Sequence, residues 1–557
     1  MIRIVNGITC MNIIEELREQ HIEGEIVGDA TAIAPFSQDY SLFRVEPQAV
    51  VEPKSVEDIK KLVRFATAKK QSGEHVSLTG RSAGTDMGGG PLNESIIVSF
   101  TQHFNHIQEM TEGYVVVEPG VYFRDLEKEL TAKGLLYPAY PASKDLCALG
   151  GMVNNNSGGE LTLKYGKTEN YIEETQLVMA DGELHTLKAL DKSQLDAKMN
   201  EQTFEGELYR KLFKLLEDNE EIIAQAKPKV TKNSAGYYLW NVWNGAVFDI
   251  NKLIVGAQGT LGLLAAAKLK VLKKKKYSRL IVIFSKSLDP IPDLVKALLP
   301  LHPDSIESYD DKTLALAMKF FPAMVKLMKG NLLKMAVNLL PEFWMIATGG
   351  VPKMILLVSV SADDPKELDA LSEEIARAAQ KFSDHVRIVK KEDEANEYWT
   401  VRRQSFNLLH SHVKGLYAAP FIDDIIVNPD VMPELLPQVN AILDQYKKEL
   451  IYTIAGHPGN GNFHIIPLVN LKDETTRRII PEVTEQVYQL VIKYGGSITA
   501  EHNDGIMRTP YLREMYGDKI IELFAEVKKI FDPLNIFNPG KKVGGTKEFA
   551  ATHMRKA

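Results

Sequence analysis

Three loops rich in glycine and other small residues constrain the fold of this chain most strongly. The first covers 79–91 (TGRSAGTDMGGGP) and places five glycines between two strand-like segments. The second covers 141–166, and the third is the short segment GAQGTLG at 256–262. Glycine lets the backbone approach a ligand closely, and successive N–H groups can form a nest for an anion. The first loop therefore favours a diphosphate site, with a plain tight turn as the alternative.

Apolar patterns around these loops alternate between strand and helix. AVVEP (49–53) has the composition of a strand, and Ser55 is a suitable N-cap for the helix that follows it. A chain of 557 residues is also too long for one hydrophobic core. The expected division is a helical lead-in at 1–45, an α+β region at 46–275 with a charged helical insertion at 185–250, a second unit at 276–500, and a C-terminal segment at 501–557.

Composition excludes several classes of protein. The net charge of −7 gives no basic footprint for nucleic acid. The two cysteines, Cys10 and Cys147, cannot form a disulfide framework or ligate an iron–sulfur cluster, so electrons from a redox site here would need an outside acceptor. Neither a secretory signal nor a long apolar run is evident, and a cytoplasmic protein is expected.

The second half carries a possible metal-binding set. HPGNGNFH places His457 and His464 seven residues apart around a turn, and SITAEHNDG later supplies Glu501 and His502. Two imidazoles and a carboxylate are a common open ligand set for Zn²⁺, Mn²⁺ or Fe²⁺. The spacing alone favours ordinary loop residues.

Two adjacent arginines stand between these regions, in EYWTVRRQ. A guanidinium fork matches the geometry of a substrate carboxylate, which favours a binding role for Arg402. Arg403 is expected on a solvated helix face. Further on, in FNPGK, Lys541 is expected at the surface.

The three loops, in this order and spacing, resemble the FAD-binding module of the vanillyl-alcohol oxidase/PCMH superfamily. Together with HPGNGNFH and the EHN segment, they are most similar to the branch of D-lactate dehydrogenases, D-2-hydroxyglutarate dehydrogenases and the glycolate oxidase flavin subunit. The resemblance covers about 46–275 and 390–545. It implies an α+β fold: a PCMH-type FAD-binding domain of two subdomains, a substrate (cap) domain with an antiparallel sheet, and C-terminal helices that return to the FAD domain.

The resemblance also assigns roles to residues of this chain. His457, His464 and Glu501 would hold the metal, His502 would be the base, and Arg402 would clamp the substrate. The implied FAD-binding residues are Arg81, Ser82, Ala83, Gly84, Thr85, Asp86, Pro141, Gly150, Gly151, Asn156, Gly158, Gly256, Gly259 and Asn538.

The chain departs from the pattern of this branch at a few positions. Ser82 and Ala83 replace two glycines of the usual RGGGT, Gln258 replaces an acid, and Asn503 replaces the glycine after the base. No histidine lies in the first loop, where covalent members carry one, so noncovalent FAD is implied.

The implied activity is oxidation of a D-2-hydroxy acid, such as D-lactate, to the 2-oxo acid by hydride transfer to flavin N5. The electrons would pass to a quinone or a protein acceptor. Two alternatives remain open: another FAD-linked oxidase or synthase of the superfamily, and an electron-transfer flavin subunit of a membrane complex. A homodimer is also left open.

A lysine-rich stretch suggests a further partner. No acidic residue occurs between Lys312 and Leu340, and Lys312, Lys319 and Lys326 are seven residues apart. A basic amphipathic segment at 312–348 would bind an anionic surface such as the inner face of the cell membrane. The alternative is a core helix pair whose lysines reach solvent.

Overall fold

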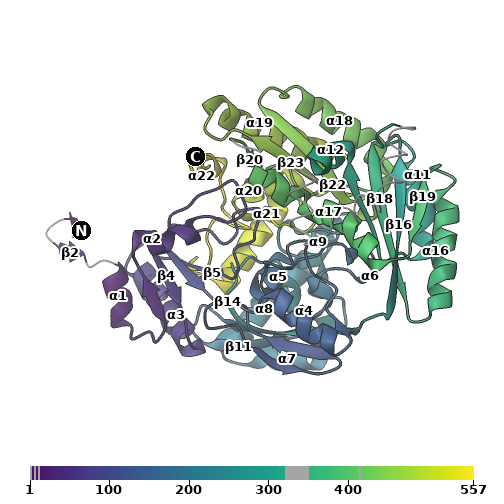
Figure 1. Cartoon of the computed structure of the whole chain (residues 1–557). Helices are drawn as coiled ribbons and strands as arrows, with labels where there is room; N and C mark the ends of the chain where they lie inside the picture. Colours follow the sequence, from purple (N-terminus) through teal and green to yellow (C-terminus); the bar gives the residue numbers. More distant parts are fainter. Residues whose placement is uncertain (1–2, 6–7, 11–12, 320–349, 413–414, 557) are drawn as a thin grey trace.

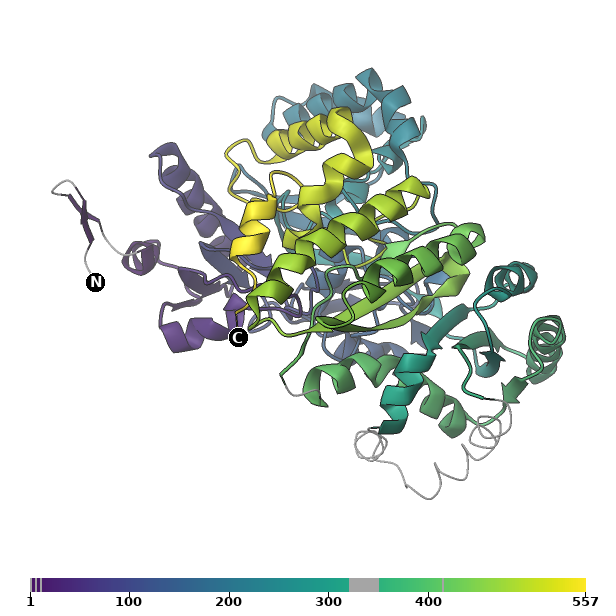
Figure 2. The same ribbon diagram turned by 90° about the horizontal axis from the view of Figure 1, so that it is seen from above.

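The computed structural model describes residues 3–5, 8–10, 13–319, 350–412 and 415–556. A short hairpin of β1 (Arg3–Val5) and β2 (Ile8–Cys10) projects from the body of the molecule, as Figures 1 and 2 show. The remainder of the expected lead-in is partly helical; it contains α1 (Ile13–Glu19), β3 (Glu25–Val27), α2 (Ala30–Ile33) and η1 (Ala34–Ser37).

The first sheet has the order β3-β4-β6-β5 and carries the first glycine-rich loop. Its other strands are β4 (Ala49–Glu52), β5 (Leu78–Arg81) and β6 (Ile96–Ser99), and β4 and β5 both run parallel to β6. The connecting helix α3 (Val56–Gln71) begins at Ser55, whose side chain accepts from the Asp58 N–H, and buries one apolar face. The glycine-rich loop therefore starts at the carboxyl end of β5.

The second sheet is antiparallel, in the order β11-β10-β14-β8-β7. Helix α5 carries the glycine pair of the second loop and ends at Asn156, whose φ of 52° is left-handed. The elements of this subdomain are β7 (Ile107–Met110), β8 (Tyr114–Val117), α4 (Phe123–Ala132), β9 (Leu135–Leu136), α5 (Leu149–Asn155), α6 (Thr162–Tyr165), η2 (Thr168–Asn170), β10 (Ile172–Val178), β11 (Leu184–Lys188), β14 (Leu263–Lys270) and β15 (Leu272–Lys273).

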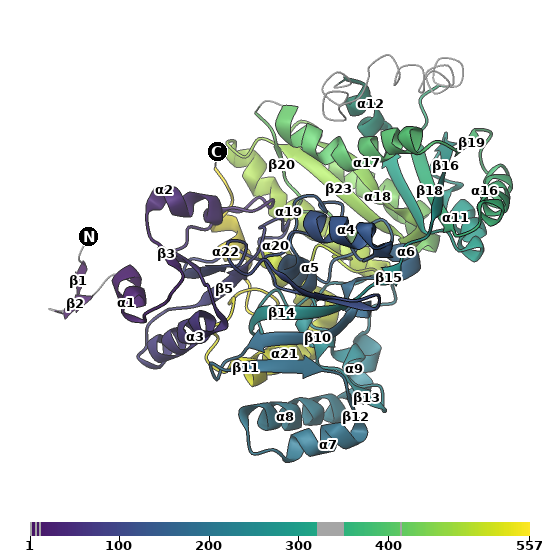
Figure 3. The ribbon, with the colours of Figure 1, turned by 60° about the horizontal axis from the view of Figure 1, so that its bottom comes forward.

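The helical insertion lies between β11 and β14. Helix α8 (Phe204–Asp218) buries Leu208, Leu212 and Leu216, which are four residues apart and so share one face. Figure 3 shows α7 and α8 at the far side of the molecule from the largest sheet. The other elements are β12 (Leu190–Asp191), α7 (Lys192–Asn200), α9 (Glu220–Ala226), η3 (Leu239–Asn241), β13 (Val247–Phe248) and α10 (Asn251–Ile254).

The cap domain is built on an antiparallel sheet of eight strands, ordered β19-β16-β18-β17-β22-β23-β20 with β21 also paired to β23. Strand β16 is buried on both faces. Ile281 and Ile283 pack in the core that includes Leu294 of α11 (Ile291–Leu298) and Ile375 of α16 (Pro365–Ala379). Leu280, Val282 and Phe284 pack on the other face, in the cluster that includes Tyr398 of α17 (Glu392–His412). This burial explains the unbroken apolar run RLIVIF in the sequence.

The strands of this sheet are β16 (Tyr277–Ser285), β17 (Ser305–Asp310), β18 (Met354–Ala362), β19 (Val386–Val389), β20 (Tyr417–Ala418), β21 (Ile425–Ile426), β22 (Leu450–His457) and β23 (Asn462–Val469). Its helices are α11 (Ile291–Leu298), η4 (Leu299–Leu301), α12 (Asp311–Lys319), α16 (Pro365–Ala379), α17 (Glu392–His412), η5 (Pro429–Val431), α18 (Met432–Asp444), η6 (Pro458–Asn460) and α19 (Glu474–Lys493).

The C-terminal segment returns to the N-terminal half of the molecule, as expected. It comprises α20 (Gly505–Arg508), η7 (Thr509–Tyr511), α21 (Leu512–Phe531) and α22 (Lys547–Thr552). Phe524 of α21 lies in the core of the second subdomain. Beyond α21 the chain pairs with β5: the Leu78 N–H donates to the Ile536 carbonyl at 2.7 Å, and the Asn538 N–H to the Leu78 carbonyl at 2.9 Å.

Most of the lysine-rich segment 312–348 lies outside the described residues, so its expected membrane contact stays a prediction. In the part of the chain that the structure describes, no helix is both long enough and apolar enough to cross a bilayer.

Candidate active site

A cavity of about 410 Å³ is lined by residues of both the N-terminal half and the cap domain. All three glycine-rich loops line it. Its lining also includes residues of α17 (Glu392–His412), β22, β23 and the segment after α19, so the predicted metal, base and clamp residues share the same space. Residues more than 300 positions apart in the sequence therefore share one cavity.

Most of the predicted FAD-binding residues line this cavity. They are Ser82, Ala83, Gly84, Thr85, Asp86, Pro141, Gly150, Gly151, Gly158 and Gly259. At Gly151 and Gly259 a Cβ atom would meet no other atom within 4 Å, so both backbones face open space. Gly259 also has a left-handed φ of 67°, which glycine adopts without strain. A bulky ligand can approach the backbone at both positions, and the loops fit a dinucleotide.

Four predicted FAD-binding residues do not line the cavity, and Arg81 is the clearest case. Its guanidinium points toward the lead-in and donates to the carbonyls of Gln38 at 2.7 Å and Phe36 at 3.3 Å. The Asn156 side chain is engaged with Glu169, and the Gly256 carbonyl accepts from Asn503. These groups therefore stabilise the loops from outside the cavity lining.

Asn538 is the fourth and joins two of the loops. Its amide donates to the carbonyls of Gly90 at 2.9 Å and Gln258 at 2.6 Å, and its Oδ1 accepts from Thr79. The FNPGK segment therefore holds the first and third loops together.

The three predicted metal ligands meet at the cap side of the cavity. Nε2 of His457 lies 3.2 Å from Nε2 of His464 and 3.1 Å from Oε1 of Glu501, and the third separation is 3.4 Å. Donor atoms around a tetrahedral Zn²⁺ with bonds of about 2.0–2.1 Å stand roughly 3.3 Å apart. The spacing of the three atoms fits a divalent cation.

Buried carboxylates hold both imidazoles from behind. Nδ1 of His457 lies 2.5 Å from Oε1 of Glu307, and Nδ1 of His464 lies 3.1 Å from Oδ1 of Asp423. Such contacts fix the tautomer and turn Nε2 toward the metal position. Burial lowers the pKa of His464, but the carboxylates of Asp423 and Glu501 outweigh it and raise the pKa to about 10. The pocket thus favours positive charge.

Lys232 fixes the third ligand. Its Nζ lies 2.9 Å from Oε2 of Glu501, and its side chain is almost fully buried. This contact leaves Oε1 of Glu501 for the histidines and holds the pKa of the carboxyl well below its usual range, against the opposing effect of burial. Lys232 comes from the end of the helical insertion, which therefore contributes to the site.

Asp424 also lies within reach of the metal position, with His464, Glu501 and His502. One of its oxygens already accepts from the backbone N–H groups of residues 500, 501 and 502 and from the Thr499 hydroxyl, at 2.6–2.8 Å. An oxygen with four donors is poorly placed to bind a cation as well. That oxygen of Asp424 shapes the segment, whereas its Oδ1, which accepts from the Asn462 amide at 3.1 Å, makes Asp424 a further candidate ligand beside the predicted set.

The predicted base, His502, lies beside the ligands. Its ring stacks on that of His464 with centroids 4.8 Å apart, and its Nδ1 lies 2.5 Å from Oδ2 of Asp423. Burial alone would lower the pKa of His502, but the nearby carboxylates of Asp423 and Asp424 outweigh burial, so the pKa of His502 lies above its usual value. With Nδ1 directed to Asp423, Nε2 is the nitrogen left to exchange a proton with a ligand in the cavity.

The two arginines of α17 both line the cavity. Arg402 lies 3.3 Å from Oε2 of Glu307, the carboxylate that also holds His457. The expectation of a solvated face for Arg403 is wrong, because its guanidinium forms a two-pronged ion pair with Glu160, with N–O distances of 2.7–3.1 Å. Lys541, expected at the surface, is likewise buried and donates to the Leu92 carbonyl.

Asn503 departs from the family pattern, and the structure shows what its side chain does. Its φ of 69° is left-handed, a conformation that asparagine tolerates better than most residues. The side-chain amide donates to the carbonyls of Asn155 at 3.2 Å and Gly256 at 2.9 Å. Asn503 thereby ties the segment of the base to the second and third loops.

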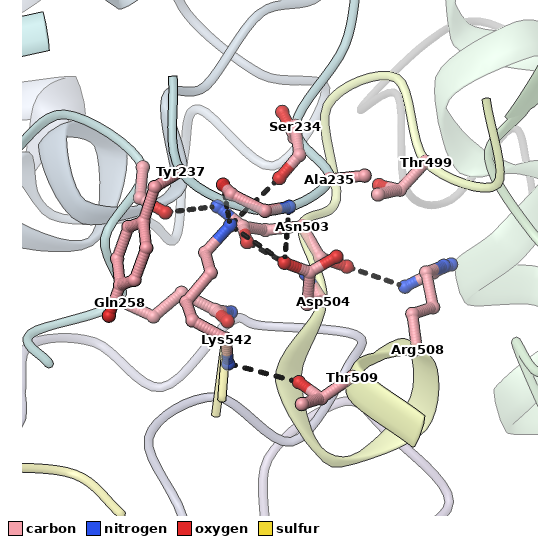
Figure 4. Close-up of polar contacts among 12 residues, drawn as sticks. Ser234, Ala235, Tyr237, Gln258, Thr499, Asn503, Asp504, Arg508, Thr509 and Lys542 are labelled. Carbon is pink, nitrogen blue, oxygen red and sulfur yellow. Dashed lines mark hydrogen bonds and ion pairs between the residues drawn. The ribbon is translucent and has the colours of Figure 1, made fainter. Parts of the chain in front are cut away.

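A buried ion pair reinforces the same junction (Figure 4). Nζ of Lys542 lies 2.8 Å from Oδ2 of Asp504, and both side chains are fully buried. Lys542 also donates to the carbonyls of Ser234 and Gly236. The third loop joins through Gln258, whose Oε1 accepts from the Gly505 N–H at 2.8 Å.

Sequence reasoning missed Glu307, Asp423, Asp424 and Lys232. The signal for the two aspartates is their place in PFIDDIIV, where two acids interrupt an otherwise apolar run. Buried acids need partners, so such a pair indicates a site. Glu307 in SIESYD gives only a weak signal, and Lys232 gives none.

Comparison with known proteins agrees with this architecture. Residues 47–188 match the FAD binding domain family, and residues 295–542 match the C-terminal domain of FAD linked oxidases. The chain is 29% identical over 538 residues to a D-2-hydroxyglutarate dehydrogenase of Pseudomonas putida, covering 95% of this chain and 51% of that protein. It thus spans about half the length of the first curated relatives it matches.

Two further proteins are similar over most of their length. The glycolate oxidase subunit GlcD of Bacillus subtilis is 25% identical over 501 residues, which cover 89% of this chain and 88% of that one. The solved structure of 4-ethylphenol oxidase from Gulosibacter chungangensis has a TM-score of 0.67 at 15% identity, with 98% of this chain and all of that one covered. The two domain families together match more than half of this chain, and the chain belongs to the PCMH-type FAD-linked oxidase family of oxidoreductases.

Proposed function

We propose that the protein oxidises a small D-2-hydroxy carboxylate to the 2-oxo acid, with FAD as the oxidant and a divalent cation that polarises the 2-hydroxyl of the substrate. The observation that carries the proposal is the single cavity that the three glycine-rich loops share with His457, His464, Glu501, His502 and Arg402. The names of the relatives, D-2-hydroxyglutarate dehydrogenase and D-lactate dehydrogenase, agree with it.

The lining residues of the three loops would hold FAD without a covalent bond. Bound FAD supplies a two-electron acceptor for the hydride on C2 of the substrate. The residues His457, His464 and Glu501 would hold Zn²⁺, Mn²⁺ or Fe²⁺, which polarises the 2-hydroxyl and lowers its pKa. A quinone or a protein would then take the electrons.

The side chains of this protein position the substrate and move its proton. Arg402 would bind the carboxylate, with its guanidinium steadied by Glu307. His502 would accept the hydroxyl proton at Nε2, and the Asp423 carboxylate would stabilise the imidazolium that results. The substrate thus loses one hydride and one proton and becomes the 2-oxo acid.

Anaerobic mixing with a panel of substrates tests this proposal. D-lactate, glycolate, D-malate and D-2-hydroxyglutarate, with the L isomers of the chiral acids as controls, would be added to FAD-loaded protein while the flavin absorbance is followed. At least one D-2-hydroxy acid should bleach the flavin within a single turnover. A flavin that no hydroxy acid reduces would instead favour a synthase or an electron-transfer subunit.

A further inference from the structure

The lysine and arginine side chains that line the cavity each have a carboxylate partner from the protein. They are Lys144, Arg402 and Arg403. Lys144 pairs with Glu127 at 2.7 Å, Arg403 with Glu160 at 2.7 Å, and Arg402 with Glu307 at 3.3 Å. The last pair is the longest, and the proposed function places one carboxylate of the substrate at Arg402.

Arg403 follows the proposed clamp Arg402 in α17 and lines the same cavity, so a second substrate carboxylate could use it. Its Nε donates to Glu160 Oε2 at 3.1 Å, and its other nitrogen reaches both oxygens at 2.7 and 2.8 Å. The face of the guanidinium lies over the Trp399 ring, 5.0 Å from the centroid. The Glu160 carboxylate in turn accepts from the Tyr140 hydroxyl at 2.8 Å. The guanidinium N–H donors of Arg403 that face Glu160 are therefore already in use, and the guanidinium group is fixed in position.

The wall beside the metal ligands carries aliphatic groups. Strands β22 and β23 pair Ala455 with His464 and Thr453 with Ile466. Since alternate residues of a strand share a face, Thr453 and Ala455 point the same way as His457, and Ile466 the same way as His464. All three line the cavity. A substrate anchored at the histidines therefore places its own side chain against methyl groups.

We infer that the protein selects 2-hydroxy monocarboxylates with a short aliphatic side chain and discriminates against dicarboxylates, with Glu160 as a determinant. This inference rests on the proposed function and names its substrate class. A second carboxylate near Arg403 would meet the negative charge of Glu160, and among the described lining residues every lysine and arginine already has a carboxylate partner. Like charges brought together without compensation disfavour a ligand by about tenfold or more.

A matched pair of substrates isolates the charge. D-2-hydroxyvalerate and D-2-hydroxyglutarate have the same number of carbons and differ in the terminal group. We expect kcat/KM for the valerate to exceed that for the glutarate at least about tenfold in the unmodified enzyme, measured with a dye acceptor. A preference for the dicarboxylate would overturn the inference.

Glu160→Gln tests the role of Glu160 directly. The amide has the same shape as the carboxylate but no negative charge, so the positive charge of Arg403 is no longer neutralised. This variant should shift the ratio of the two kcat/KM values at least about tenfold toward 2-hydroxyglutarate. Asp363→Asn is the control, since it removes one carboxylate from an exposed pair with Lys275, and its ratio should stay unchanged.

A second variant covers the case that Glu160→Gln does not fold. Ile466→Lys adds a cation to the aliphatic wall and should shift the ratio in the same direction. An unchanged ratio in the folded variants would refute the role of these residues. Failure of every hydroxy acid to reduce the flavin would refute the proposed function instead, so the two failures are distinguishable.

Discussion

The buried carboxylate of Glu307 contacts both a predicted metal ligand, His457, and the proposed substrate clamp, Arg402. Replacement by glutamine removes the negative charge of this side chain and keeps its size and shape. Oε1 lies 2.5 Å from Nδ1 of His457, and Oε2 lies 3.3 Å from Arg402. Burial raises the pKa of Glu307, but His457 and Arg402 outweigh this effect, so the group is held as an anion. In Glu307→Gln the amide oxygen can still accept from His457, but the negative charge behind the imidazole is lost.

We expect this change to weaken metal binding about tenfold to a hundredfold, which is typical for loss of a carboxylate behind a metal-binding histidine. The factor corresponds to roughly 1.4–2.8 kcal/mol. Because Arg402 loses its partner as well, KM for the hydroxy acid should rise. Competition with a chromophoric chelator measures the metal affinity, and steady-state kinetics at saturating metal measure KM.

Asp310→Asn is the matched control. Asp310 is a buried acid on the same strand β17, and its carboxylate accepts from the Ile454 N–H and from Thr313 rather than from a histidine. The control should keep the metal affinity of the unmodified protein, and both variants should keep FAD. Equal metal affinity in the unmodified protein and Glu307→Gln would refute the reasoning.

Three further changes have measurable outcomes. His502→Ala should bind FAD normally but lose flavin reduction by about a hundredfold or more, the contribution of a positioned base; normal reduction in stopped-flow absorbance would assign the base elsewhere. Asn503→Gly removes two hydrogen bonds between the base segment and the loops, and should lower the free energy of unfolding by about 1–3 kcal/mol in urea titrations; an unchanged value would contradict the tie. For His185, burial lowers the pKa, but Asp181 and Glu205 raise it to about 9, so the stability it adds should be full below pH 6.5 and lost as the pH rises toward 9. Between pH 6.5 and 9 the free energy of unfolding of the unmodified protein should therefore fall by up to about 3 kcal/mol more than that of His185→Gln, as measured by denaturant titration at each pH. The same pH dependence of the unfolding free energy in both proteins would refute the assignment.

Local sequence patterns predicted much of the fold and part of the site. The alternation of apolar residues indicated the strands, and HPGNGNFH with EHN named four side chains that do converge. Each of these motifs is short, so its functional side chains lie close together in the sequence and can be recognised without knowledge of the fold. The α+β fold with its antiparallel cap sheet and returning C-terminal segment is confirmed.

The remaining site residues depend on contacts that the sequence does not display. Glu307 precedes His457 by 150 residues, and Lys232 precedes Glu501 by 269. Arg403 and Lys541 were expected in solvent because long cations usually are, and their partners lie 243 and 449 residues away. A charged side chain is assigned to the surface by default until its distant partner is known.

The pairing of Leu78 with Ile536 and Asn538 bears on how the chain is made. Strand β5 is an edge of the first sheet, and residues near the end of the chain cover that edge. During synthesis the strand leaves the ribosome long before residues 536–538 exist, and an uncovered edge can pair with other chains. The first subdomain is therefore incomplete, and needs protection from aggregation, until residues 536–538 have been synthesised.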